Sequence, residues 1–116
     1  MLVTVMKSKI HRAKVTASEL DYEGSITIDS ELIKKAHLLI GEKVLVANLV
    51  NGLRIETYVI EGPPGSGTIC INGAAAHRFS IGDRVIIMSF AHMTLEEAQT
   101  FKPTRIKVDN NNKIIS

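Results

Sequence analysis

The sequence has few cysteines, prolines and aromatic residues. It contains one cysteine, three prolines and no tryptophan among 116 residues. The single cysteine, Cys70, excludes an intrachain disulfide and a cysteine metal cluster, and its apolar surroundings predict a small buried residue. Because aromatic residues are only 4% of the chain, the core is expected to be aliphatic, and its Val and Ile residues favour strands.

Long hydrophobic runs and a large excess of one charge are also missing. No run approaches the ~20 apolar residues that span a bilayer, and no apolar segment typical of a signal peptide follows the N-terminal charges. We therefore expect a cytoplasmic protein with no membrane partner. The net charge is only +2, and the basic cluster from Lys7 to Lys14 lacks interleaved aromatics, which argues against nucleic-acid binding. The scattered histidines predict no metal site.

Short strands dominate what is present. The length predicts one domain covering residues 1–116. Alternating apolar and β-branched residues predict strands at residues 2–6, 9–16, 25–28, 43–50, 53–60, 68–71, 84–90 and 105–109. Short helices are expected at residues 31–39 and after a capping box at residues 94–97. These elements predict a mainly β fold, a closed or nearly closed barrel.

Local signals predict where elements begin and end. Asp29 or Ser30 is expected to cap the first helix, and Gly41 to end it. Asn51-Gly52 lies between two apolar runs and predicts a tight hairpin turn with both residues at positive φ. The glycine- and proline-rich residues 62–67 predict a surface loop.

The dipeptide Gly24-Ser25 is the strongest chemical signal. Its serine hydroxyl is an internal nucleophile for the Gly24 carbonyl, at effectively unimolecular proximity. Glycine before the scissile bond gives the backbone freedom to distort. Taken alone, the dipeptide would more simply be a turn at a strand entrance, so its interpretation depends on the flanking motifs.

Those motifs occur in a specific order along the chain. They are Lys9-Ile10-His11-Arg12, Tyr22-Glu23-Gly24-Ser25, Asn51-Gly52, Arg54 with Thr57-Tyr58, residues 71–77 (INGAAAH) and Gly82-Asp83. In this order the sequence resembles the pyruvoyl-dependent aspartate 1-decarboxylases over nearly its whole length. The resemblance implies a double-psi β-barrel with short helices. It also implies a lyase that converts L-aspartate to β-alanine and CO2 for pantothenate and coenzyme A biosynthesis.

The resemblance further implies that the chain is a zymogen that cleaves itself. Autocatalytic cleavage after Gly24 would give a β chain of residues 1–24 and an α chain of residues 25–116. Ser25 would become a pyruvoyl group, the only cofactor, which forms a Schiff base with the substrate. Thr57 would contact the Gly24 oxygen, and Asn72 would add a further polar contact. Whether cleavage is spontaneous or needs a maturation factor stays open.

The remaining site residues follow from the charge of aspartate and from the same resemblance. Arg54 offers a two-pronged donor to a substrate carboxylate, with Lys9 as a second cation. Tyr58 is the expected acid that reprotonates the carbanion. Further expected contributors are the backbone N–H groups of Gly73, Ala74 and Ala75 for a carboxylate, and His11 and Tyr22 as supporting hydrogen-bonding residues. The family forms tetramers with active sites between subunits.

One geometric conflict and three other classes of protein stay open. Regular alternation would place Arg54 and Tyr58 on one face of a strand and Thr57 on the other, so a bulge or a subunit junction is needed to reconcile them. The main alternative function is a noncatalytic β-barrel that binds a ligand or partner without processing Ser25. A nucleic-acid-binding β-protein and an ordinary serine hydrolase are weaker alternatives.

Overall fold

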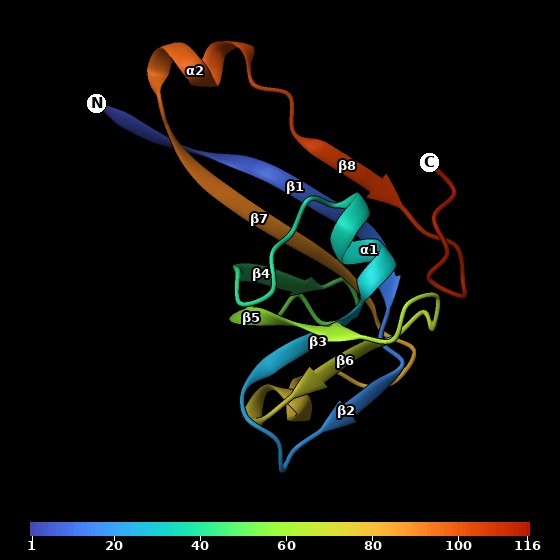
Figure 1. Cartoon of the computed structure of the whole chain (residues 1–116). Helices are drawn as coiled ribbons and strands as arrows, with labels where there is room; N and C mark the ends of the chain where they lie inside the picture. The colour runs from blue at the N-terminus through green and yellow to red at the C-terminus, as the bar shows by residue number, and fades with distance from the viewer.

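A computed structural model describes all 116 residues and shows eight strands wrapped into a barrel (Figure 1). Their order in the sheet is β2-β6-β3-β5-β4-β7-β1-β8. The elements are β1 (Leu2–Lys14), β2 (Ala17–Glu19), β3 (Ser25–Asp29), α1 (Ser30–Lys35), β4 (Lys43–Asn48), β5 (Arg54–Gly62), β6 (Ile69–Asn72), the 3-10 helix η1 (Ala74–Arg78), β7 (Arg84–Thr94), α2 (Leu95–Thr100) and β8 (Thr104–Lys107).

The barrel is closed by the N-terminal segment of the chain. β1 pairs with β7, and β2, which follows directly, pairs with β6 on the other side. Between them, Val15 N donates to Asp83 O at 2.9 Å and Thr16 N donates to Ile69 O at 2.8 Å. The segment from β1 to β2 therefore connects the β7 side of the wall to the β6 side and closes the barrel.

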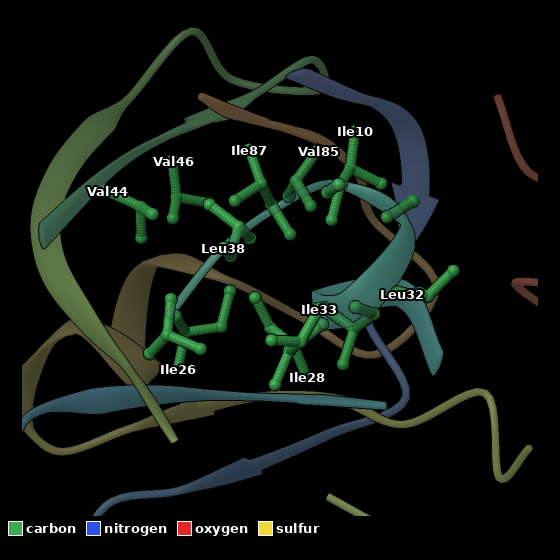
Figure 2. Close-up of a cluster of buried hydrophobic side chains, with 14 of the residues drawn as sticks. Ile10, Ile26, Ile28, Leu32, Ile33, Leu38, Val44, Val46, Val85 and Ile87 are labelled. Atoms are coloured by element: carbon green, nitrogen blue, oxygen red, sulfur yellow. The ribbon is translucent and has the colours of Figure 1, made fainter. Parts of the chain in front are cut away.

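The core is aliphatic, as the composition predicts. It contains 19 buried hydrophobic residues, of which Phe79 is the only aromatic one. Figure 2 shows Val44, Val46 and Ile87 on one wall facing Ile26 and Ile28 on the opposite wall. The side chains of α1 and of the loop after it fill the space between these walls; they are Leu32, Ile33 and Leu38.

The first helix begins as predicted and ends earlier than predicted. The Asp29 carboxylate caps it by accepting a hydrogen bond from Glu31 N at 2.9 Å. The helix ends at Lys35, and His37 takes a positive φ of 57° two residues later. The expected end at Gly41 is therefore wrong, because the chain turns away early to bring Leu38 into the core.

The connection between β4 and β5 is wider than the predicted two-residue turn. β4 ends at Asn48 and β5 begins at Arg54, and only Gly52 within the connection has a positive φ, of 76°. Asn51 instead uses its side chain, which accepts from Leu53 N at 2.9 Å and donates to Arg78 O at 3.1 Å. These side-chain hydrogen bonds stabilise a broader loop in place of the tight hairpin.

The N-terminal half of β1 and the C-terminal half of β7 form a two-stranded arm that leaves the barrel and carries α2 at its end (Figure 1). β7 continues to Thr94, beyond the predicted end at residue 90, because it stays paired with β1. The capping box at the start of α2 is confirmed by the reciprocal bonds between Thr94 and Glu97. None of the helices is long and apolar enough to cross a membrane.

Candidate active site

The paired strands β3 and β6 present opposite chemistry on their two faces. Ser25 and Asn72 are direct partners in this antiparallel pair, and Thr27 and Cys70 are the next facing pair. The residues that alternate with these four along the two strands are buried in the core; they are Ile26, Ile28, Ile69 and Ile71. Strict alternation in two short strands thus gathers four polar side chains on the outer face of the barrel wall.

The Ser25 hydroxyl is buried and held by two hydrogen bonds. Its residue is only 1% exposed. The hydroxyl donates to Glu23 O at 3.0 Å and accepts from Asn72 Nδ2 at 3.0 Å. Since this oxygen belongs to the residue that follows the Gly24 carbonyl, these two bonds orient a nucleophile beside its own peptide bond.

Gly73 lies directly against the segment that contains the scissile bond. Its φ is 82°, and a Cβ on it would lie 2.8 Å from Gly24 Cα and 2.9 Å from Gly24 N. At Gly24, by contrast, an added Cβ would meet no atom within 4 Å, and its φ lies outside the left-handed region. In the uncleaved chain a close backbone contact therefore requires glycine at position 73, whereas Gly24 has neither a positive φ nor a contact that a Cβ would disturb.

Tyr58 lies beside this segment because β5 runs parallel to β3, with Val59 opposite Ile26. The pKa of the Tyr58 hydroxyl is raised above its ordinary value, first by desolvation and then by the neighbouring Glu23 carboxylate, with Tyr22 adding to the effect. The phenol stays protonated at neutral pH, which is the state that a proton donor needs. The sequence does not single out Glu23 as a site residue, although Glu23 lies within the motif Tyr22-Glu23-Gly24-Ser25.

Thr57 and Tyr58 project to opposite faces of β5. The β4–β5 register is regular, with Val44 opposite Thr57 and Lys43 opposite Tyr58. Val44 is a buried core residue, so Thr57 faces the barrel interior while Tyr58 faces outward. The bulge considered from the sequence is absent from this strand pair.

Lys9 and Arg54 lie on a different part of the barrel wall. Lys9 on β1 pairs with Met88, and Arg54 at the start of β5 pairs with Ala47. Arg54 is four residues from Tyr58 along one strand, which is about 13 Å at ~3.3 Å per residue. Between β1 and β3 the sheet order places β7, β4 and β5.

The predicted site residues therefore form two groups on one chain. We call the first the processing centre: Tyr22, Glu23, Gly24, Ser25, Tyr58, Asn72 and Gly73. We call the second the cation face: Lys9 and His11 on β1 and Arg54 on β5, on the outer surface of the sheet with β7 and β4 between them. On one chain the two groups stand on different parts of the barrel wall, four residues apart along β5 and separated by β4 and β7 from β1.

His11 is the least satisfied polar group of the cation face. Its Nδ1 atom is buried and has no hydrogen-bond partner. The pKa of His11 is lowered, first by desolvation and then by the charges of Lys9, Arg12 and Lys107. The ring is therefore neutral at neutral pH, and it is available to accept or donate a hydrogen bond.

The remaining predicted residues lie close to the processing centre. Ala74 and Ala75 begin η1 directly after Gly73, and the Gly73 carbonyl accepts from Ala76 N at 3.0 Å. Ala74 is exposed, and Ala75 packs against the core. Tyr22 is 53% exposed on the loop before Ser25. No cluster of three or more His, Cys, Asp or Glu side chains could hold a metal ion.

Comparison with solved structures shows the fold. A rationally designed double-psi β-barrel protein superimposes with a TM-score of 0.51 at 19% identity, covering 66% of this chain and 90% of that one. The double-psi barrel expected from the sequence is confirmed. At this identity the likeness concerns the fold alone.

Comparison of sequences shows the family. The family model described as aspartate decarboxylase matches residues 1–115. The aspartate 1-decarboxylase of Caldicellulosiruptor saccharolyticus is 57% identical over 115 residues, covering 99% of this chain and 90% of the relative. That of Corynebacterium efficiens is 55% identical over 116 residues, covering 100% and 85%. The chain, with its buried serine beside Gly24, belongs to the aspartate decarboxylase family.

Proposed function

We propose that this chain is a self-processing aspartate 1-decarboxylase that converts L-aspartate to β-alanine and CO2. The observation that carries the proposal is the buried Ser25 hydroxyl, held between Glu23 O and Asn72 Nδ2 beside the Gly24 carbonyl. Family membership supplies the substrate, and this geometry supplies the means of making the catalytic group. Cleavage after Gly24 yields chains of residues 1–24 and 25–116.

The processing reaction uses only this chain and one water molecule. The Ser25 oxygen attacks the Gly24 carbonyl carbon, the carbon–nitrogen bond breaks, and the hydroxyl proton ends on the freed amine, leaving an ester. Loss of the Ser25 α proton then expels the Gly24 carboxylate and leaves a dehydroalanine. Its Cβ takes up a proton to give an imine, and water adds to the imine carbon and releases the nitrogen as ammonia. Asn72 stabilises developing charge on the serine oxygen through its N–H. Thr57 is the proposed donor to the Gly24 oxygen: although its side chain faces the barrel interior, the β3–β5 register continued two residues before Ile26 would bring it opposite Gly24.

The residues around Ser25 fit a pyruvoyl group, because the position is buried and has an amide donor at 3.0 Å. That group, once formed, supplies an electron sink for the pair left behind by CO2. Tyr58, kept protonated by its surroundings, delivers the proton to the carbon that lost CO2. The backbone N–H groups of Gly73, Ala74 and Ala75 hold a substrate carboxylate.

Arg54 and Lys9 bind the substrate from another copy of the chain. Their separation from Ser25 on one chain means that a site holding all three needs at least two copies, with Arg54 giving a bidentate contact to a carboxylate. A homotetramer with sites between neighbours meets this need. His11 and Tyr22 support the site by hydrogen bonding. The enzyme works in the cytoplasm, where β-alanine feeds pantothenate and coenzyme A biosynthesis.

The proposal is tested by mass spectrometry of the denatured protein after prolonged incubation. Two fragments divided after Gly24 are expected, the larger one lighter by one ammonia than a chain that starts with serine. The preparation should then release CO2 from L-aspartate. Intact chains that persist even with extract of the source organism, which would supply a maturation factor, would overturn the proposal and favour a noncatalytic binding barrel.

A further inference from the structure

Four buried or half-buried polar side chains on the outer face of β3 and β6 form a hydrogen-bonded network centred on one amide. They are Ser25, Thr27, Cys70 and Asn72. The Asn72 amide is at its centre: Nδ2 donates to Ser25 Oγ at 3.0 Å and to Thr27 Oγ1 at 3.0 Å. On its other side, the Cys70 thiol donates to Asn72 Oδ1 at 3.2 Å.

Every strong donor of the Asn72 amide is used in this arrangement. One N–H donates to Ser25 Oγ and the other donates to Thr27 Oγ1. The amide oxygen accepts a hydrogen bond from the Cys70 thiol. The pKa of the Cys70 thiol is raised by burial and then by the charge of Glu19, so the sulfur carries its proton at neutral pH. A protonated thiol is a donor, and its natural partner is the amide oxygen.

The orientation of this amide decides what the serine oxygen meets. As it stands, an N–H points at Ser25 Oγ, and the hydroxyl proton is directed at Glu23 O. If the amide turned by half a rotation, its oxygen would face Ser25 and compete for that proton. A donor stabilises the negative charge on the Ser25 oxygen once its proton is lost, and again when the Cβ–Oγ bond breaks and the oxygen leaves with the Gly24 carboxylate. A carbonyl oxygen in the same place opposes that charge.

We propose that Cys70 and Thr27 are positioning residues for self-cleavage, which hold the Asn72 amide with its N–H on the Ser25 oxygen. Neither side chain touches the scissile bond, and each acts through Asn72. This inference rests on the proposed function, because it assigns residues to the cleavage step. It also explains why a small polarisable residue and a threonine occupy the outward positions of two otherwise isoleucine-rich strands.

The test compares paired substitutions that differ by one hydrogen-bonding group. Cys70→Ala removes the donor, whereas Cys70→Ser has nearly the same size as alanine and restores a donor. Thr27→Val removes the acceptor while keeping the shape, and Thr27→Ser restores it. The readout is the first-order rate constant of cleavage after Gly24, followed by denatured mass spectrometry from freshly purified, uncleaved protein.

Cys70→Ala and Thr27→Val are each expected to slow cleavage about tenfold, the rate equivalent of one lost hydrogen bond. The serine variants are expected to cleave within about threefold of the parent chain. The melting temperature is recorded for each variant, and Ile71→Val, on the inner face of β6, serves as a packing control that lowers stability and leaves the rate unchanged.

Each outcome bears on a different claim. Equal rates for Cys70→Ala and Cys70→Ser, or parental rates for Cys70→Ala and Thr27→Val, would overturn the positioning role while leaving the proposed function intact. If Cys70→Ala or Thr27→Val does not fold, the pair of variants at the other position still tests the positioning role. A parent chain that never cleaves, with or without extract of the source organism, would overturn both.

Discussion

The processing centre and the cation face are built in opposite ways. In the processing centre, Ser25 is 1% exposed, Asn72 is 3% exposed, and both are tied together by hydrogen bonds within one chain. On the cation face, Arg54 is exposed, and His11 Nδ1 is buried without a partner. The serine and asparagine of the processing centre have their hydrogen-bond partners within a single copy. The cation face has polar groups without partners, which another molecule would have to supply.

This contrast matches the two reactions of the proposed function. Self-cleavage is unimolecular, so the groups that perform it have to be preorganised inside one folded chain. Substrate binding needs cations that stay free to meet two carboxylates, so these side chains lie on the surface until substrate or a neighbouring copy arrives. The division predicts that variants in the two regions fail at different steps.

The largest effect is expected for Ser25→Ala, which removes the nucleophile. This variant should fold and give no fragment in a denatured mass spectrum, however long it is incubated. Ser8→Ala is a matched control, because Ser8 is also 1% exposed and hydrogen-bonded to Ser89 at 2.7 Å, outside the processing centre. Cleavage of Ser25→Ala after Gly24 would show that the Ser25 hydroxyl is not the nucleophile. The processing centre would then no longer differ from the cation face in the step that it performs.

Gly73→Ala tests the close approach of two backbone segments. The new Cβ would lie 2.8 Å from Gly24 Cα, so the loop has to shift, and we expect loss of most cleavage together with ~1–3 kcal/mol of stability. Gly82→Ala shares the positive φ, at 96°, but its Cβ would meet nothing within 4 Å. It should lose stability and still cleave. Equal cleavage rates for both variants would show that the contact with Gly24 is unimportant.

Arg54→Ala should leave cleavage intact and lower kcat/KM for aspartate by about 30- to 1000-fold, the cost of losing a charged, two-pronged contact. Lys43→Ala is the control on the neighbouring strand, since its exposed ion pair with Glu56 should contribute little. Both variants are assayed after complete cleavage has been verified by mass.

Co-expression of Arg54→Ala with Ser25→Ala sharpens the comparison further. If sites form between copies, some sites receive an intact Ser25 from one chain and an intact Arg54 from the other. Activity should then return in the mixed oligomer, although each variant alone lacks it. Mixed oligomers as inactive as the separate variants would place both residues in one chain's site.

The sequence predicts more of the processing centre than of its surroundings. The motif around Gly24-Ser25 and the alternation in residues 25–28 are local, and the strand that they predict begins at Ser25 as β3. The role of Cys70 in the network depends on pairing with Thr27 of β3 across 43 residues, although the alternation of Cys70 with Asn72 is a usable signal. Non-local contacts of this kind are not encoded in any local pattern.

Boundary errors have a similar physical origin. The helix after β3 looked longer because residues 36–39 continue its apolar pattern, yet Leu38 reaches the core from a turn instead. The predicted hairpin at Asn51-Gly52 became a wider loop because Asn51 bonds to Arg78 O, 27 residues away. In both places tertiary contacts override local propensity.

The smallest expected effect is a change in the titration of Tyr58. The chain has two tyrosines and no tryptophan, so Tyr22→Phe combined with Ser25→Ala leaves Tyr58 as the only source of tyrosinate absorbance in an uncleaved chain. Because desolvation and the Glu23 carboxylate both raise the pKa of Tyr58, its titration should lie above the ordinary value near 10.

Adding Glu23→Gln should move that titration downward without returning it fully, since desolvation is the larger cause and remains. Glu19→Gln is the control, a carboxylate on β2 that does not contribute to the shift of Tyr58. A Tyr58 that titrates at its ordinary value, unaffected by Glu23, would separate it from the processing centre. The proton donor would then have to come from the same neighbouring copy that supplies Arg54, and β5 would no longer be divided between the two regions by Tyr58 and Arg54.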